Sequence, residues 1–271
     1  MNIDRVEDVV MPILQVDGLT RRFGGLNAVD NACFSVEPQT ITSLIGPNGA
    51  GKTTVFNLIS GLLAPTSGSV KLRGKVISNL LPQTICHLGL GRTFQEPRVF
   101  GAMTVLENVM VGRRRQKGES LIPALLRTPQ VLRDEQQNLE RAMEILRFVG
   151  LDGRPGDLAQ TLSYGQQRFL SIARVLAAEP EVLLLDEPTV GLHPEEIKRL
   201  MKLIVDMVKE RLRTVLLIEH NMDVVMGLSD WVILLVQGTV VASGPPDEIK
   251  KNKTLLEAYL GASYSRSYAD A

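Results

Sequence analysis

The residues best suited to chemistry form a glycine-rich loop at positions 46–53, which reads Gly-Pro-Asn-Gly-Ala-Gly-Lys-Thr. This is a complete G-x-x-x-x-G-K-[ST] pattern, in which backbone N–H groups surround phosphate oxygens. Lys52 can place a cation on the β- and γ-phosphates, and the Thr53 hydroxyl can bind Mg²⁺. The loop indicates a nucleoside triphosphate but does not say what its hydrolysis drives.

The segments on either side of the loop indicate how it is held. An apolar β-type run at 41–45 leads into the loop, and a helix-forming stretch at 54–63 leads out of it. Such a helix points the positive end of its dipole at the bound anion. The alternative, a merely flexible glycine-rich turn, would not require this strand–loop–helix context.

A second chemical group ends the apolar run at 182–185, which is followed by Asp186 and Glu187. Ligands of open α/β sheets bind at the carboxyl ends of the strands, so we expect Asp186 beside the phosphate loop, holding Mg²⁺ through water. Glu187 points elsewhere, toward the γ-phosphate, where a carboxylate can polarise an attacking water. The alternative is an ordinary strand end with exposed acids, and the phosphate loop upstream argues against it.

Residues 162–167, Leu-Ser-Tyr-Gly-Gln-Gln, precede a predicted helix at 168–178. Ser163 is a good N-cap, and Gly165 lets the backbone approach a ligand closely. One nucleotide does not need two such helix starts from one chain. We therefore expect a second subunit, with Ser163 contacting the nucleotide that the partner holds.

The bulk composition excludes several function classes. The 271 residues are 44% hydrophobic and carry 30 basic and 30 acidic side chains, which indicates a folded globular chain without the basic excess of a nucleic-acid-binding protein. The basic run at 113–117 is interpreted as a solvated loop or helix end, with nucleic-acid binding as the alternative.

The two cysteines, Cys33 and Cys86, suit a reducing cytoplasm. Residues 1–9 hold no apolar leader, and no apolar run approaches the ~20 residues of a membrane span, so we expect membrane action only through a partner.

Short apolar strands alternate with amphipathic helices, which predicts a parallel sheet covered on both faces. Residues 91–166 are more polar and helical, with a one-faced helix that Gly150 and Gly153 end. Residues 233–236 and 239–242 are expected to pair as a hairpin around Gln237 and Gly238. The other predicted strands are 13–16, 32–36, 41–45, 70–76, 182–185 and 214–218, with further helices at 197–208 and 253–260.

These motifs, in this order, resemble the nucleotide-binding subunit of an ATP-binding cassette (ABC) transporter, and 162–167 is similar to its LSGGQ signature with Tyr164 in place of the first glycine. The resemblance implies an α/β, P-loop NTPase fold: a RecA-like parallel sheet core with an antiparallel β subdomain, plus an α-helical subdomain. Its domain, 11–261, would comprise a nucleotide-binding core at 12–90 and 167–243, a helical subdomain at 91–166 carrying the signature, and a tail at 244–271.

The resemblance also implies the site. Two subunits would sandwich two ATP molecules, with Phe23 stacked on adenine, Gln95 sensing Mg²⁺ and water, and His220 contacting the γ-phosphate. His193 stands in the D-loop where Asp is frequent, which leaves its inter-subunit role open. The implied catalytic residues are Lys52, Glu187 and His220, and the Mg²⁺ residues are Thr53, Gln95 and Asp186. The implied nucleotide contacts are Phe23, Gly46, Pro47, Asn48, Gly49, Ala50, Gly51, Lys52, Thr53, Thr54, Gln95, Ser163, Gly165 and Gln166.

Local details at 91–95, 103–109, 113–136 and 257–261 resemble the larger ATPase subunit of bacterial branched-chain amino-acid importers. That resemblance implies a second ATPase subunit, as a homodimer or heterodimer, two membrane permeases and an extracytoplasmic solute-binding protein. It places the chain peripherally on the cytoplasmic face of the inner membrane. The groove that receives a permease helix would be lined by the apolar side chains of Phe94, Pro97, Val99, Phe100 and Met103, for which ordinary core packing is the alternative.

Several alternatives stay open at this stage. A urea, short-amide or aromatic-acid importer would use the same kind of subunit, and an exporter ATPase is a further alternative that the insertion at 113–136 disfavours. A non-transport ABC ATPase usually carries two cassettes, a coiled coil or a zinc insertion. A P-loop kinase would need neither 162–167 nor a histidine after the acidic pair. The sequence names neither the solute nor the role of the insertion.

Overall fold

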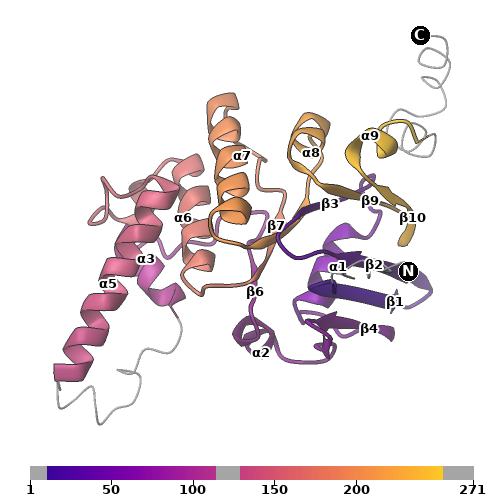
Figure 1. The fold of residues 1–271 in the computed structure, drawn as a ribbon, viewed down its shortest axis with the longest axis horizontal. Coiled ribbons are helices and arrows are strands. Elements are labelled where there is room, and N and C mark those ends of the chain that lie inside the picture. The colour runs from indigo at the N-terminus through magenta and orange to yellow at the C-terminus, as the bar shows by residue number, and fades with distance from the viewer. Residues whose placement is uncertain (1–10, 114–128, 253–271) are drawn as a thin grey trace, which may run out of the picture. The chain divides into compact units, whose positions relative to one another are not determined.

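The computed structural model describes residues 11–113 and 129–252 of the chain (Figure 1). It divides into two compact units, of which the first contains the described residues up to Leu81 and those from Ser229 onward. The second unit is Pro82–Leu228. The predicted tail helix at 253–260 and most of the insertion at 113–136 lie outside the described residues.

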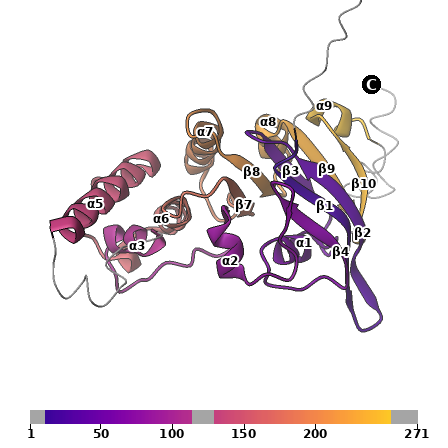
Figure 2. The same ribbon diagram turned by 60° about the horizontal axis from the view of Figure 1, so that its bottom comes forward.

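The first unit contains an antiparallel sheet with the strand order β2-β1-β4-β5 (Figure 2). The strands β1 and β2 are longer than predicted. They pair, with bulges, as far as Phe23 and Leu26, and a turn at Gly24 and Gly25 joins them. The predicted run at 70–76 is two strands joined at Arg73 and Gly74, both of which have positive φ. The bounds are β1 Leu14–Phe23, β2 Leu26–Val36, β4 Ser67–Leu72 and β5 Lys75–Val76.

The phosphate loop lies between strand β3 (Ile41–Ile45) and helix α1 (Lys52–Ile59) of the first unit. Every residue of β3 is buried, and the strand runs parallel to β9 (Trp231–Val236). Strand β10 (Thr239–Gly244) pairs antiparallel with β9, which confirms the hairpin, and the short helix α9 (Pro246–Ile249) follows. Strand β3 is therefore held by a strand from the far end of the chain.

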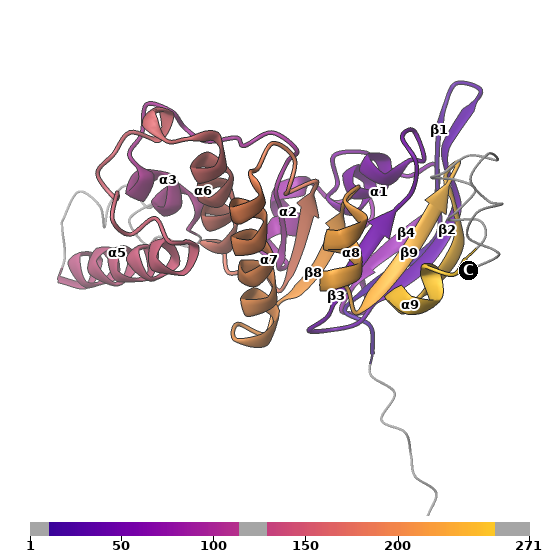
Figure 3. The ribbon, with the colours of Figure 1, turned by 90° about the horizontal axis from the view of Figure 1, so that it is seen from above.

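The second unit contains three parallel strands in the order β8-β7-β6. Strands β7 (Val182–Asp186) and β8 (Thr214–Ile218) are buried throughout, as their continuous apolar runs predict. Helix α7 (Pro194–Lys209) runs beside β8 and buries one apolar face, including Leu200, Ile204 and Met207 (Figure 3). Three short elements were not predicted: α2 (Pro82–His87), β6 (Leu90–Arg92) and α8 (Met222–Leu228).

The helices α3 (Val105–Gly112), α5 (Pro129–Val149) and α6 (Tyr164–Leu176) pack together in the second unit (Figure 1). Gly150, at φ 67°, follows α5 as predicted. Helix α6 begins four residues before the predicted start at 168, because Ser163 and Gln166 form a capping box. A 3₁₀ turn (Ala159–Thr161) leads into it. The α/β fold with antiparallel β and helical parts is confirmed, while the subdomain boundaries stay predictions.

Candidate functional site

The phosphate loop has a backbone that only glycine permits at its ends. Gly46 has φ 155° and Gly51 has φ 100°. A Cβ atom on Gly46 would lie 2.0 Å from the Leu235 carbonyl oxygen, and one on Gly51 would lie 2.3 Å from the Ala28 carbonyl oxygen. The neighbouring strands therefore fix the path of the loop, while Asn48 and Gly49 are exposed at its crest.

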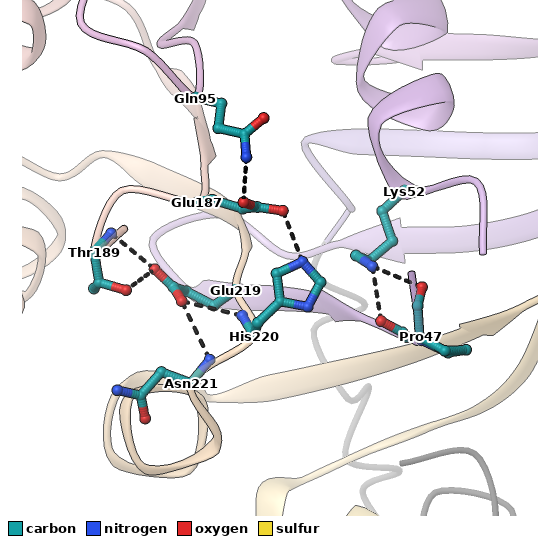
Figure 4. A network of polar contacts seen from close by, with 9 residues as sticks. Pro47, Lys52, Gln95, Glu187, Thr189, Glu219, His220 and Asn221 are labelled. Atoms are coloured by element: carbon teal, nitrogen blue, oxygen red, sulfur yellow. Dashed lines mark hydrogen bonds and ion pairs between the residues drawn. The ribbon is translucent and has the colours of Figure 1, made fainter. Parts of the chain in front are cut away.

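Lys52 is buried and folds back over its own loop. Its Nζ donates to the carbonyl oxygens of Gly46, at 2.7 Å, and of Pro47, at 3.0 Å (Figure 4). Thr53 is exposed and Thr54 is half-buried in the first turn of α1. Gly51 precedes α1 and has no capping side chain, so the first amides of the helix suit an anion. The loop therefore fits the phosphates of a nucleotide.

We expect Gly51→Ala to destabilise the protein in the absence of any nucleotide. A left-handed alanine and the contact with the Ala28 carbonyl oxygen together should lower the free energy of unfolding by about 3 kcal/mol. Gly74→Ala is the matched control, because Gly74 also has positive φ but a Cβ there meets nothing within 4 Å. Urea denaturation should show a loss of only about 1 kcal/mol for the control. Equal losses would contradict this account of the loop.

Glu187 lies at the centre of a polar network in the second unit. It follows β7 with φ 46°, which is unusual for a residue with a side chain. Its Oε2 accepts a hydrogen bond from Gln95 Nε2 at 2.7 Å, and its Oε1 lies 2.7 Å from His220 Nε2 (Figure 4). The three residues follow β6, β7 and β8, and the parallel order brings these strand ends to one edge.

This arrangement suits a general base. The Glu187 side chain is 14% exposed, so most of its surface is already removed from solvent. The roles in the His220 contact depend on the ring tautomer: with the proton on Nε2, the imidazole donates and the Glu187 carboxylate accepts. Each carboxylate oxygen accepts one described bond and has a second lone pair, so the group can still take a proton from water.

Asp186 is held by a residue that the sequence analysis did not single out. Arg92 Nη2 lies 3.0 Å from Asp186 Oδ2, and both side chains are almost completely buried. Burial lowers the pKa of Arg92, while the charge of Asp186 and its hydrogen bond oppose that effect. The available signal was the position of Arg92 at the end of β6, next to β7 in the sheet.

The residues that the structure describes contain no cluster of three or more His, Cys, Asp or Glu side chains that could hold a metal. A site with one carboxylate suits Mg²⁺ only when phosphate oxygens and water complete its coordination. The Thr53 hydroxyl in the first unit and the Asp186 carboxylate in the second unit are each a ligand of that kind. The residues therefore fit a metal that arrives with a triphosphate, rather than a preformed metal site.

The signature segment forms the expected helix start. Ser163 Oγ accepts from the Gln166 backbone N at 3.2 Å, and Gln166 Oε1 accepts from the Ser163 N at 3.0 Å. Ser163 is exposed, whereas Gly165 is buried. A Cβ atom on Gly165 would lie 2.1 Å from Glu196 Oε1. In the described structure, this glycine therefore packs closely against a side chain of α7.

The remaining predicted residues lie at accessible positions. The Phe23 ring is 44% exposed at the end of β1, with the Arg21 guanidinium 4.7 Å from its centroid. Phe100 and Met103 are also exposed. His193 immediately precedes α7, and its backbone N donates to Glu196 Oε2 at 3.0 Å, which gives it a local role in starting the helix.

Comparison with known proteins identifies the family. Residues 29–190 match the family model described as ABC transporter. The chain is 46% identical to the high-affinity branched-chain amino acid transport ATP-binding protein LivG of Escherichia coli, over 92% of this chain and 98% of that protein. The chain belongs to the ABC transporter family. As an ABC transporter ATPase, it is an ATP-hydrolysing protein whose reaction is coupled to transport.

Two further relatives of this ABC transporter ATPase agree with that assignment. It is 44% identical to the corresponding protein BraF of Pseudomonas aeruginosa, over 92% of this chain and 98% of that protein. It also resembles the crystal structure of the ADP conformation of an ATP-binding cassette of an ABC transporter, with a TM-score of 0.80 and 32% identity over 93% of this chain and 99% of that one. Within the described residues, we find no helix long and apolar enough to cross a bilayer.

Proposed function

We propose that this chain hydrolyses ATP to drive the import of branched-chain or related hydrophobic amino acids. The hydrogen-bonded position of Glu187 between Gln95 and His220 supports the hydrolytic role. The likeness to LivG and BraF, both described as branched-chain amino acid transport ATP-binding proteins, supports the solute class. These relatives are matched over almost their whole length, so the comparison covers complete subunits.

In this proposal, the phosphate loop and Lys52 bind the triphosphate, with Phe23 stacked against the base. Charge on the phosphates is met by the backbone amides of 49–54 and by the Lys52 ammonium. Thr53, Asp186 and Gln95 would hold Mg²⁺, which when bound would neutralise charge on the phosphate oxygens. The protein therefore contributes mainly positioning and electrostatic stabilisation, which is what phosphoryl transfer requires.

Glu187 positions the attacking water. As the water oxygen bonds to the γ-phosphorus, the bond from that phosphorus to the bridging oxygen breaks, ADP leaves, and the water proton passes to the Glu187 carboxylate. Gln95 and His220 keep the carboxylate in one orientation through their two hydrogen bonds. His220 would also donate to a γ-phosphate oxygen. Its Nε2 proton would then be shared between that oxygen and Glu187 Oε1.

The proposed assembly contains a second ATPase subunit, two permeases and an extracytoplasmic solute-binding protein. The exposed helix start at Ser163 supports the second ATPase, because it offers an anion site in addition to the phosphate loop of the same chain. The exposed Phe100 and Met103 side chains suit a permease contact. In such an assembly the chain lies at the cytoplasmic face of the inner membrane.

Uptake by a deletion strain tests the proposal. Deleting the gene should abolish high-affinity uptake of labelled leucine, isoleucine and valine, and the wild-type gene should restore it while the Glu187→Gln variant should not. Labelled urea, acetamide and benzoate distinguish the alternative importers. Unchanged uptake of all three branched-chain amino acids, with loss of another solute, would reassign the transporter.

A further inference from the structure

Arg168 is a buried arginine that contacts two other segments of the second unit as well as the first residue of its own helix. It is 1% exposed and projects from the first half of α6. Its Nη1 donates to the Phe94 carbonyl oxygen at 3.0 Å, directly before Gln95. Its Nη2 donates to the Tyr164 hydroxyl at 3.0 Å and to the Val190 carbonyl oxygen at 3.3 Å. The guanidinium thus joins the signature helix to the segments carrying Gln95 and Glu187.

Glu219, which directly follows strand β8, also contacts the segment that contains Val190. It is also 1% exposed, and its Oε1 accepts from Thr189 N at 2.9 Å and from Thr189 Oγ1 at 2.6 Å. Its Oε2 accepts from the backbone N of His220 at 3.1 Å (Figure 4). Two adjacent residues, Thr189 and Val190, are therefore each bonded to a buried charged side chain.

We propose that Arg168 and Glu219 are positioning residues that together hold segment 187–190 and so keep Glu187 in its active orientation. This inference rests on the proposed role of Glu187. The positive φ of Glu187 is a costly conformation, which persists only where surrounding contacts enforce it. Hydrogen bonds to charged groups are among the strongest that a protein can use for this purpose.

Electrostatics supports the pairing. Burial lowers the pKa of Arg168 from its ordinary value, and the Tyr164 hydroxyl, Glu219 and Asp186 oppose that shift. The cation is therefore compensated by groups on the strand ends and on α6. Removing it would leave the Phe94 and Val190 carbonyls without this donor and Glu219 without its compensating charge.

The same contacts give Tyr164 a role, although it departs from the family signature. Its hydroxyl accepts one Arg168 N–H, and a Cβ atom on Gly191 would lie 2.7 Å from its Cε1 atom. The ring therefore packs against the end of the segment that Glu187 begins. In this chain the Tyr164 side chain, at the third signature position, links the helix start to that segment, where glycine would have none.

The test compares Arg168→Gln with Arg199→Gln in the assembled transporter. Arg199 is the control because it too donates to two carbonyl oxygens, of Val149 and Gly150, and lies 4.8 Å from the Phe169 ring centroid, while none of these contacts involves segment 187–190; unlike Arg168, it is exposed. Both changes should lower the melting temperature. Only Arg168→Gln should lower kcat, by about 10- to 100-fold, with ATP affinity within about threefold of wild type.

Tyr164→Phe provides the second variant, since it keeps the ring and removes the hydroxyl acceptor. We expect a smaller fall in kcat, of about threefold, and a smaller fall in melting temperature than in Arg168→Gln, because Arg168 keeps its two carbonyl partners. If Arg168→Gln fails to fold, this variant decides the matter. Normal kcat in Tyr164→Phe, or equal kcat in the two arginine variants, would overturn the inference. Normal turnover in Glu187→Gln would instead show that the proposed function of Glu187 is wrong.

Discussion

Replacing Glu187 with glutamine should lower the turnover of the assembled ATPase by about 1000-fold while ATP binding persists. Glutamine has nearly the same size but cannot accept the proton of the attacking water. Its amide also cannot accept from both Gln95 Nε2 and His220 Nε2, because one of its two terminal atoms is now a donor. ATP should remain bound, and if the chain pairs with a second ATPase subunit as proposed, the two subunits should stay associated.

Steady-state phosphate release and a filter-binding assay with labelled ATP measure the two halves of this expectation. Glu195→Gln is the matched control, because Glu195 is an exposed carboxylate whose described partner is the surface residue Lys198. The control should retain wild-type turnover. A Glu187→Gln protein that hydrolyses ATP within threefold of the control would exclude Glu187 as the general base.

Replacing Lys52 with alanine should lower ATP affinity by at least about 100-fold and abolish measurable turnover. The Lys52 ammonium is buried and bonded to two carbonyl oxygens of the loop, so its removal also takes a donor from the loop. We therefore expect an additional loss of about 2 kcal/mol in the free energy of unfolding without nucleotide.

Titration with a fluorescent ATP analogue and urea denaturation separate these two effects. Lys71→Ala is the control, since Lys71 forms an ion pair with Asp17 in the same unit with both side chains partly exposed, a kind of pair that contributes little. Its affinity and stability should match those of the wild type. Retained ATP affinity in Lys52→Ala, with the loop still folded, would refute the assignment of this lysine.

The sequence predicted the parts of the fold whose burial is continuous. Strands β3, β7 and β8 are buried at every position, so their apolar runs are unbroken and easy to find. Strand β6 has three residues, α2 has six and α8 has seven, so none of them is long enough to generate a clear periodic pattern. The start of α6 was placed too late because the helix begins at its capping box, before its apolar stripe.

The same reasoning explains which site residues could be predicted. Glu187 follows an unbroken apolar strand, so the strand-end rule placed it at the sheet edge, whereas Gln95 and His220 were expected only from the family resemblance. Arg168 and Glu219 follow no such rule, because a charged residue within a helix or after a strand is usually solvated. Their burial and their shared contact with segment 187–190 become visible only when the chain is folded.

The packing of the phosphate loop against the β9–β10 hairpin has a consequence for biosynthesis. The Gly238 N donates to the Ala50 carbonyl oxygen at 2.9 Å, the Leu235 carbonyl lies against Gly46, and β3 pairs with β9. A growing polypeptide on the ribosome therefore contains the whole motif at 46–53 long before the residues that shape it are translated. The nascent chain can therefore give the loop its described shape only after strands β9 and β10 have been synthesised, so nucleotide binding must await a contact between residues about 190 positions apart.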